Sequence, residues 1–338
     1  MTPWRQWRAA AALALAAASG PRPAGAQQPP IIIALPAPTL TFSSPFLAED
    51  AGFYKKEGLD VSHRILVGVE AVNAVIAGSA QFTIGTGPVF LRAAAHGQRL
   101  LVIANLIDKP LVEMVMRKDV AQAMKFDDGR SLAERGRLLK GRTIAIQGVG
   151  SIIHAWERLV AARGGLDPET DVRIAPMDPP AMLGALQTKA VDGFATSLPY
   201  TTQAVMNGTA VMFASAAQGV APDLLPFPYG LVMTKPQTCK EHPEECAGVV
   251  CAFADSNRMI HDQPEKALGI LAKRFAEMDQ AVLKTAWKTV AAAHATDFRV
   301  DDALLAQADK VNTEAKLLDP KAKLTSYAGL YTAEFLPK

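Results

Sequence analysis

The segment Gln147-Gly148-Val149-Gly150-Ser151 has residue types and spacing that could bind an anion. It follows the apolar, β-prone run Thr143 to Ile146 and precedes a helix-like segment that starts at Ile152. A glycine turn between a strand and a helix exposes backbone N–H groups at the helix N-terminus, and these groups attract phosphate or another anion. The segment therefore raises two possibilities, a nucleotide site or a site for a smaller polar group.

Both common nucleotide-binding patterns are incomplete in this segment. A P-loop places a lysine after its last glycine, but Gly150-Ser151 is followed by Ile152. The dinucleotide fingerprint needs a third glycine, and Ile153 stands at that position. We therefore expect the turn to hold a small anion or a polar head group, with Ser151 adding a hydroxyl. A plain helix cap that faces water is the alternative.

Catalytic and metal-binding patterns are missing from the sequence. It contains no G-x-S-x-G and no H-E-x-x-H, and its six histidines include no pair three or four residues apart. The acidic pairs Asp127-Asp128 and Asp301-Asp302 are typical of loop and helix-start charges. We predict no catalytic residues, no metal site and no cofactor. An exported enzyme whose catalytic residues form no familiar pattern remains the alternative.

Four loops that follow predicted strands are rich in hydroxyls, amides and glycine and poor in charge. In α/β sheets, ligands bind outside the carboxyl ends of the strands, and neutral hydrogen-bonding groups suit reversible binding of a small molecule. Because none of the four loops contains an arginine, a neutral solute or a monoanion is favoured. The predicted ligand-binding residues, with three aromatic rings for an apolar or planar ligand body, are Thr39, Thr41, Phe42, Ser43, Gly85, Thr86, Gln147, Gly148, Gly150, Ser151, Thr196, Ser197, Tyr200 and Tyr229.

Strand-like and helix-like segments alternate from Ile31 onward, which predicts an α/β fold with largely parallel sheets. The segment 119–139 is charged and weakly patterned, so we expect a surface excursion there. The predicted strands are 31–37, 59–67, 81–86, 100–106, 111–118, 143–147, 172–177, 192–196, 210–214 and 229–233. The predicted helices are 43–58, 70–77, 88–96, 152–163, 181–188, 199–207, 242–262, 264–276, 279–293 and 301–316.

The order of these elements predicts two lobes. A second lobe, 114–225, interrupts a first lobe made of 27–113 and the mostly helical 226–338. The two crossings, near Glu113 and Pro226, would form a hinge.

Residues 1–26 are predicted to be a cleaved signal peptide. Arg5 and Arg8 precede an alanine- and leucine-rich run, and Ala24-Gly25-Ala26 offers a cleavage site before Gln27. We therefore expect export to the periplasm, with a cytosolic tail as the alternative. The segment carries three arginines and no acidic residue, so its removal takes the formal charge from +2 to −1. A chain with this charge lacks the excess of basic residues that nucleic-acid binding needs. No later apolar run is long enough to predict a transmembrane helix.

Three cysteines follow the predicted leader. Cys239 lies just before the predicted helix start at His242-Pro243, and Cys246 falls in the first turns of that helix. A loop folding back over this turn could bring their sulfur atoms together, so we predict a Cys239–Cys246 disulfide. Cys251 lies in an apolar run and is expected to be a small buried residue.

Five segments resemble the nitrate/sulfonate/taurine-type solute-binding proteins of ABC importers. They are AEDAGFYKKEGLDV (48–61), AVIAGSAQFTIGTGP (74–88), LLKGRTIAIQGVGS (138–151), ALQTKAVDGFATSLP (185–199) and HPEECAGVVCAFADSNRMI (242–260). The resemblance covers most of the chain in the family's order. It implies a type 2 periplasmic binding protein: two α/β lobes, a two-strand hinge, a helical C-terminal segment and a ligand in the cleft. It also implies a monomer that delivers a sulfonate, nitrate, carboxylate or similar solute to permease and ATPase subunits.

Two departures from the family pattern bear on the ligand. Gln81 stands where many relatives carry an acidic residue, and Leu198-Pro199 stands where many have Glu-Pro. We expect the second change to alter a wall of the cleft, so a relative's substrate does not transfer. The same superfamily includes a yeast enzyme that makes a thiamin precursor from its own histidine, but this chain lacks the cysteine cluster of that enzyme. A ligand sensor for a signalling partner is the remaining alternative.

Overall fold

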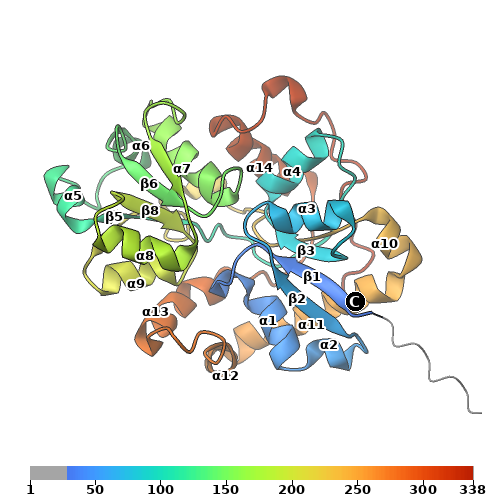
Figure 1. Ribbon diagram of the computed structural model, residues 1–338. Helices are drawn as coiled ribbons and strands as arrows, with labels where there is room; N and C mark the ends of the chain where they lie inside the picture. The colour runs from blue at the N-terminus through green and yellow to red at the C-terminus, as the bar shows by residue number, and fades with distance from the viewer. Residues whose placement is uncertain (1–28, 338) are drawn as a thin grey trace, which may run out of the picture.

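The computed structural model describes residues 29–337, and Figure 1 shows two α/β lobes side by side. The predicted signal peptide, 1–26, lies outside the described residues. Within them, no helix combines the length and apolar character needed to cross a bilayer.

The first lobe is built on a five-stranded sheet in the order β2-β1-β3-β10-β4. Strands β1, β2 and β3 run parallel, whereas β10 runs antiparallel to both of its neighbours. Strand β1 consists only of apolar residues because both faces of a largely parallel sheet are covered. The strands are β1 (Ile31–Leu35), β2 (Val61–Ile65), β3 (Phe82–Gly85), β4 (Leu101–Asn105) and β10 (Leu231–Thr234).

The second lobe repeats this plan with the order β7-β6-β8-β5-β9. Strands β6, β7 and β8 run parallel, and β5 runs antiparallel to β8 and β9. The strands are β5 (Glu113–Arg117), β6 (Thr143–Ile146), β7 (Arg173–Pro176), β8 (Gly193–Thr196) and β9 (Ala210–Ser215).

Helices cover both sheets. The 3₁₀ turns are η1 (Leu40–Phe42), η2 (Pro222–Leu224) and η3 (Pro320–Ala322). The helices up to β9 are α1 (Ser43–Asp50), α2 (Phe53–Lys56), α3 (Glu70–Ala77), α4 (Gly87–Ala95), α5 (Lys118–Ala123), α6 (Leu132–Arg137), α7 (Ile152–Arg163), α8 (Pro179–Gln187) and α9 (Tyr200–Met206). The later helices are α10 (Pro236–Glu241), α11 (Pro243–Asp262), α12 (Pro264–Leu271), α13 (Gln280–Ala291) and α14 (Asp302–Glu314).

The two antiparallel strands bring both chain crossings to the cleft. Leu231, the first residue of β10, pairs with Gly85 at the carboxyl end of β3, and Glu113, the first residue of β5, pairs with Thr196 at the carboxyl end of β8. Each crossing therefore enters its sheet at the edge where the parallel strands end. This arrangement places the loops after the parallel strands of both lobes around the same gap.

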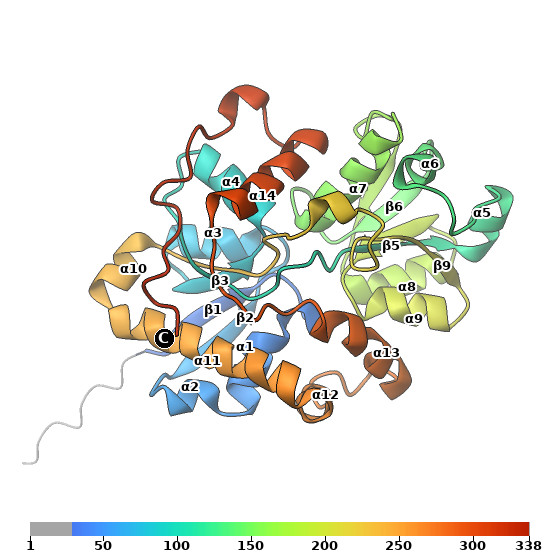
Figure 2. The same ribbon diagram turned by 180° about the vertical axis from the view of Figure 1, so that it is seen from behind.

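Helix α14 contacts both lobes. It packs on α4 of the first lobe and on α7 of the second, as Figure 2 shows from behind. Arg163 of α7 pairs with Glu314 of α14 at 2.8 Å, and Arg158 of α7 donates to the carbonyl of Ala315 at 2.6 Å. The lobes are thus joined by side-chain contacts as well as by the two crossings.

The structure corrects four local expectations. The predicted helix 43–58 is split into α1 and α2 at Gly52, whose φ of +79° is left-handed. The run Ser43-Ser44-Pro45 predicts a helix start with serine as the cap, but Ser43 is the first residue of α1, and its hydroxyl donates to Leu40 O. The segment 119–139 contains α5 and α6, the latter opened by a Ser131–Glu134 capping box.

The fourth correction concerns Cys251, which is only half-buried. Cys239 and Cys246 are joined by a disulfide. The backbone between them is not a loop, because Cys239 lies on the short helix α10.

Candidate functional site

A cavity lies between the two lobes at the carboxyl edges of their sheets. The cavity has a volume of about 60 Å³, several times the roughly 10–15 Å³ that one water molecule needs. From the first lobe it is lined by Thr41, Phe42, Gly85, Thr86 and Tyr229; from the second, by Gln147, Ser151 and Ser197. Residues from all four polar loops singled out in the sequence therefore meet here.

The first-lobe wall carries two buried hydroxyls without hydrogen-bond partners. Thr86 follows β3 and is the N-cap residue of α4, yet its Oγ1 atom does not bond to the helix and has no other partner in the described part of the chain. Thr41, in η1, likewise has an unpaired and buried Oγ1 atom. A buried hydroxyl without a partner costs about 1–3 kcal/mol. Both residues line the cavity, and neither hydroxyl has a hydrogen-bond partner among residues 29–337.

In the second-lobe wall, one of the predicted residues orients another. The hydroxyl of Thr196, at the end of β8, donates to Oε1 of Gln147 at 3.0 Å. Gln147 lines the cavity, whereas Thr196 is fully buried and does not. Because Oε1 of the amide is engaged, the Nε2 amino group is the part of Gln147 that remains for a ligand.

Internal hydrogen bonds organise the glycine turn. Ser151 caps α7, because its Oγ atom accepts from the N–H of His154 at 3.2 Å and donates to Gly148 O at 2.7 Å. The N–H of Gly150 donates to Nδ1 of His154 at 3.0 Å. The Ser151 proton and the Gly150 N–H are thus used within the turn. The N–H groups of Ile152 and Ile153, two cavity-lining residues in the first turn of α7, have no acceptor within the helix.

His154, which is not among the predicted ligand-binding residues, supports the glycine turn through hydrogen bonds to Gly150 and Ser151. It is buried, and burial, with lesser contributions from Arg158 and Arg92, lowers the pKa of His154 to about 4. The imidazole is therefore neutral near pH 7, and its Nδ1 can accept the Gly150 proton. His154 follows Gly150 by four residues and lies in the first turn of α7. This spacing is the one feature of the sequence that could have indicated the contact.

The remaining predicted residues lie outside the lining. Thr39 is fully buried and occupies the N-cap position of η1 without a capping hydrogen bond from its side chain, and the carbonyl oxygen of Gly148 accepts a hydrogen bond from Ser151. Tyr200 packs in the apolar core of the second lobe, where burial raises its pKa. Gly150 lines a neighbouring pocket at the cleft together with Arg92.

The two departures from the family pattern have structural roles away from the cavity. Oε1 of Gln81 accepts a hydrogen bond from the backbone N–H of Ile32 at 2.8 Å, which holds the residue just before β3 against β1. Leu198 is buried in the apolar core and does not line the cavity, so the expectation that Leu198-Pro199 forms a wall is wrong. The neighbouring Ser197 provides that part of the wall.

The cavity has neutral walls, because every lining residue is apolar or an uncharged polar residue. A buried carboxyl group lies nearby at the crossing. Glu113 accepts hydrogen bonds from Thr201 and, at 2.8 Å, from Ser215, and burial raises its pKa. Its partners hold β5, α9 and β9 of the second lobe together, and Glu113 does not line the cavity.

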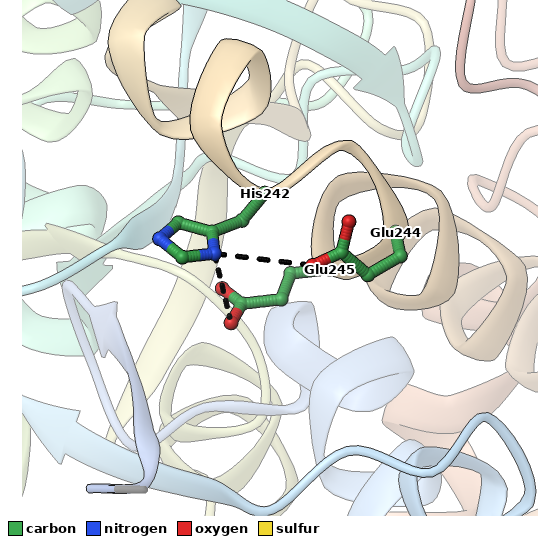
Figure 3. Close-up of side chains that lie close together, drawn as sticks. All are labelled: His242, Glu244 and Glu245. Atoms are coloured by element: carbon green, nitrogen blue, oxygen red, sulfur yellow. Dashed lines mark ion pairs between the residues drawn. The ribbon is translucent and has the colours of Figure 1, made fainter.

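A cluster of His242, Glu244 and Glu245 lies at the start of α11, as Figure 3 shows. Nδ1 of His242 is 3.8 Å from a carboxylate oxygen of each glutamate, and His242 and Glu244 are exposed. Negative side chains stabilise the first turn of a helix. The cluster is therefore explained by local electrostatics, and none of its residues lines the cavity.

The chain matches a family model described as NMT1/THI5 like over residues 41–267. Proteins of Brucella abortus and Brucella suis that are named as binding proteins are 26% identical to it over 241 residues, which are 71% of this chain and 69% of theirs. This match confirms the family resemblance seen in the sequence.

Solved structures show the same fold. A protein from Bordetella bronchiseptica RB50 has a TM-score of 0.79 at 21% identity, covering 90% of this chain and 95% of its own. The alkanesulfonate-binding protein SsuA from Xanthomonas axonopodis has a TM-score of 0.68 at 20% identity, covering 91% of this chain and 99% of its own. The periplasmic nitrate-binding protein NrtA from Synechocystis PCC 6803 has a TM-score of 0.64 at 12% identity, covering 90% of this chain and 86% of its own. The predicted two-lobed fold is confirmed.

Proposed function

The chain belongs to the NMT1/THI5-like family, and from this premise we propose that it captures a small polar or monoanionic organic solute between its lobes and delivers it to an ABC permease. The single observation that carries this proposal is the cavity, to which loops of both sheets contribute uncharged hydrogen-bonding groups. A ligand that contacts both lobes favours the closed arrangement by its higher affinity for that arrangement.

The lining supports a ligand with a small polar head and an apolar body. Thr41 and Thr86 offer unpaired hydroxyls, and Gln147 offers its amide N–H groups. The first turn of α7 adds backbone N–H groups, which favour an oxygen-bearing head such as a carboxylate, sulfonate or nitrate. Phe42, Val72 and Ile84, all in the first lobe, supply apolar contact.

Binding without chemical turnover is part of the proposal. Neutral lining residues can hold a solute, whereas general acid–base catalysis needs a titratable group within hydrogen-bond reach of the reacting atoms. The names of the relatives agree, because they describe binding proteins.

We also propose export to the periplasm as a monomer, with a cleaved leader, 1–26, and lobe limits of 27–113 with 226–338 and 114–225. Similar proteins are named as periplasmic. The permease and ATPase subunits would be separate chains that recognise the closed form.

The test is thermal unfolding of residues 27–338 with sulfonates, nitrate, small carboxylates, aromatic acids and pyrimidines. A ligand that binds only the native state adds about 2.7 kcal/mol at a hundredfold excess over its Kd. A shift with one chemical class, without conversion of that compound in mass spectra, supports the proposal. Conversion of the compound would instead identify an enzyme, and no shift in a folded sample would remove these ligand classes.

A further inference from the structure

Arg92 connects three separate parts of the molecule beside the cleft. It lies on α4, and its Nη1 group donates to Oδ1 of Asn312 on α14. Its Nη2 group donates to the carbonyl oxygen of Gly150, in the glycine turn of the second lobe. One guanidinium therefore joins the two lobes at the turn that contributes Gln147 and Ser151 to the cavity.

Arg92 has no carboxylate partner. Among residues 29–337, no acidic oxygen lies within 4.0 Å of its guanidinium, and burial lowers its pKa to about 10. A desolvated cation without a counterion is costly, so the two hydrogen bonds must offset that cost. Hydrogen bonds to charged groups are stronger than those between neutral groups.

The partners of Arg92 are themselves fixed. Asn312 is fully buried, and its Nδ2 group donates to Pro88 O at 3.0 Å, which ties it to the start of α4. On the other side, Gly150 has a left-handed φ of +78° and donates to His154. A Cβ atom built on Gly150 would lie 3.7 Å from Val69 of the first lobe, so the turn is in close contact with that lobe.

We propose that Arg92 is a positioning residue of the ligand site, which holds the Gly148–Ser151 turn of the second lobe against α4 of the first. This inference rests on the proposed function for its meaning, because the turn borders the proposed ligand cavity. Closure of the lobes then places Gln147 and the first turn of α7 over the cavity in one defined position. In the open form, the guanidinium loses the Gly150 carbonyl but keeps Asn312.

The side-chain shape matters as much as its charge. Two donors on one rigid fork reach Asn312 and Gly150 together, whereas a lysine amine at the end of a flexible stem cannot reproduce this geometry. Arg92→Lys therefore separates the role of the fork from that of the charge.

The test uses the ligand-free protein and measures hydrogen exchange at the amides of residues 148–153. Arg92→Met is expected to speed exchange there at least tenfold without a matching change in the β1 or β6 amides, and Arg92→Lys should behave in the same way. Arg299→Met is the control, because Arg299 is exposed and its one ion pair among residues 29–337 is with Asp297. Unchanged exchange in Arg92→Met would overturn the proposal. If the amides of residues 148–153 exchange as slowly in Arg92→Lys as in the wild type, the shape of the guanidinium is not required.

Two further measurements guard against a folding defect and a wrong ligand class. Asn312→Ala keeps Arg92 but removes its orienting partner, and it should speed exchange at the turn by a smaller factor. Methanesulfonate then serves as the probe, and Arg92→Met should weaken its binding at least tenfold. If methanesulfonate does not bind the wild-type protein, the sulfonate class fails, but the exchange data still decide the role of Arg92.

Discussion

The hydroxyl of Ser197 lies 3.2 Å from the phenolic oxygen of Tyr229, and this hydrogen bond connects the two lobes at the wall of the cavity. Ser197 follows β8 in the second lobe, and Tyr229 ends the crossing that leads into β10 of the first. Both side chains are buried. Burial, and the nearby carboxylate of Glu113, raise the pKa of Tyr229, so the phenol stays protonated and can donate.

Tyr229→Phe should lower the free energy of unfolding by about 1 kcal/mol, because it leaves Ser197 without a partner while conserving the ring. Urea denaturation measures this change, with an unaltered m-value as the sign that the fold is kept. Tyr331→Phe is the matched control, since the Tyr331 hydroxyl bonds to Asp302 on the surface. An equal loss in both variants would contradict a special role for the contact between the lobes.

Thr86→Val should affect stability and binding in opposite directions. The Oγ1 atom of Thr86 is buried and has no hydrogen-bond partner in the part of the chain that the structure describes. Its replacement by a methyl group should therefore leave the ligand-free protein equally stable or more stable by about 1 kcal/mol. The same change should weaken binding of the solute identified by thermal unfolding about tenfold, as calorimetry would show. The control is Thr83→Val, because the Thr83 hydroxyl donates to Ala34 O at 2.9 Å. That variant should lose stability, and a loss in both variants would refute the argument.

Thr196→Val tests whether Gln147 must be oriented. The variant frees Oε1 of Gln147 without changing any residue of the lining. We expect about a tenfold weaker solute affinity, because the amide then samples several rotamers and orientations. Calorimetric titration measures the affinity. Thr188→Val is the control, because the Thr188 hydroxyl is exposed and donates to Gly184 O of the preceding helix. Full affinity in Thr196→Val would show that the amide makes no contact with the ligand.

Glu157 should make stability depend on pH. It is fully buried on α7, and both of its carboxyl oxygens lack a hydrogen-bond partner among residues 29–337. Burial raises its pKa from 4.5 to about 7, against a smaller opposing effect of Arg158. Between pH 4.5 and 7 the folded protein therefore keeps a proton that the unfolded chain releases. Its contribution is fully present below pH 4.5 and is lost as the pH rises through 7. One pKa unit corresponds to about 1.4 kcal/mol, so the loss is on the order of 3 kcal/mol.

Glu157→Gln should remove this dependence. The variant is expected to match the wild type near pH 4.5 and to exceed its unfolding free energy at pH 8, as urea titrations at both pH values would show. Glu277→Gln, at an exposed position, should follow the wild type throughout. Parallel pH profiles for Glu157→Gln and the wild type would show that the Glu157 carboxyl titrates normally.

Replacing both disulfide cysteines with serine should cost about 2 kcal/mol of stability, because the cross-link closes a short loop in the unfolded chain. Thermal unfolding measures the loss, and Cys251→Ser is the control. Addition of a reductant to the wild type should reproduce the effect. An unchanged unfolding midpoint in the double variant would contradict a stabilising role of the disulfide.

The local pattern of the chain determined most of the fold. Gly78 ends α3 at the predicted residue, and its left-handed φ of +83° explains why a glycine is found there. The all-apolar β1 and the strand–helix alternation predicted parallel sheets covered on both faces. The gathering of polar loops followed as well, because the carboxyl ends of parallel strands share one edge. These features depend on neighbours within a few residues, which a sequence displays directly.

The tertiary structure alone decided which polar group serves which purpose. Thr86 and Thr196 follow strands in the same way, yet one hydroxyl stays unpaired and the other is used to hold Gln147. Tyr200 is packed in a core, whereas Tyr229 lines the cavity. Arg92 and Gly150 are 58 residues apart, and only the packing of α4 beside the glycine turn brings them together. A hydrogen bond needs its two atoms within about 3 Å, and for groups distant in the chain that distance is set by how the lobes pack and not by spacing along the sequence.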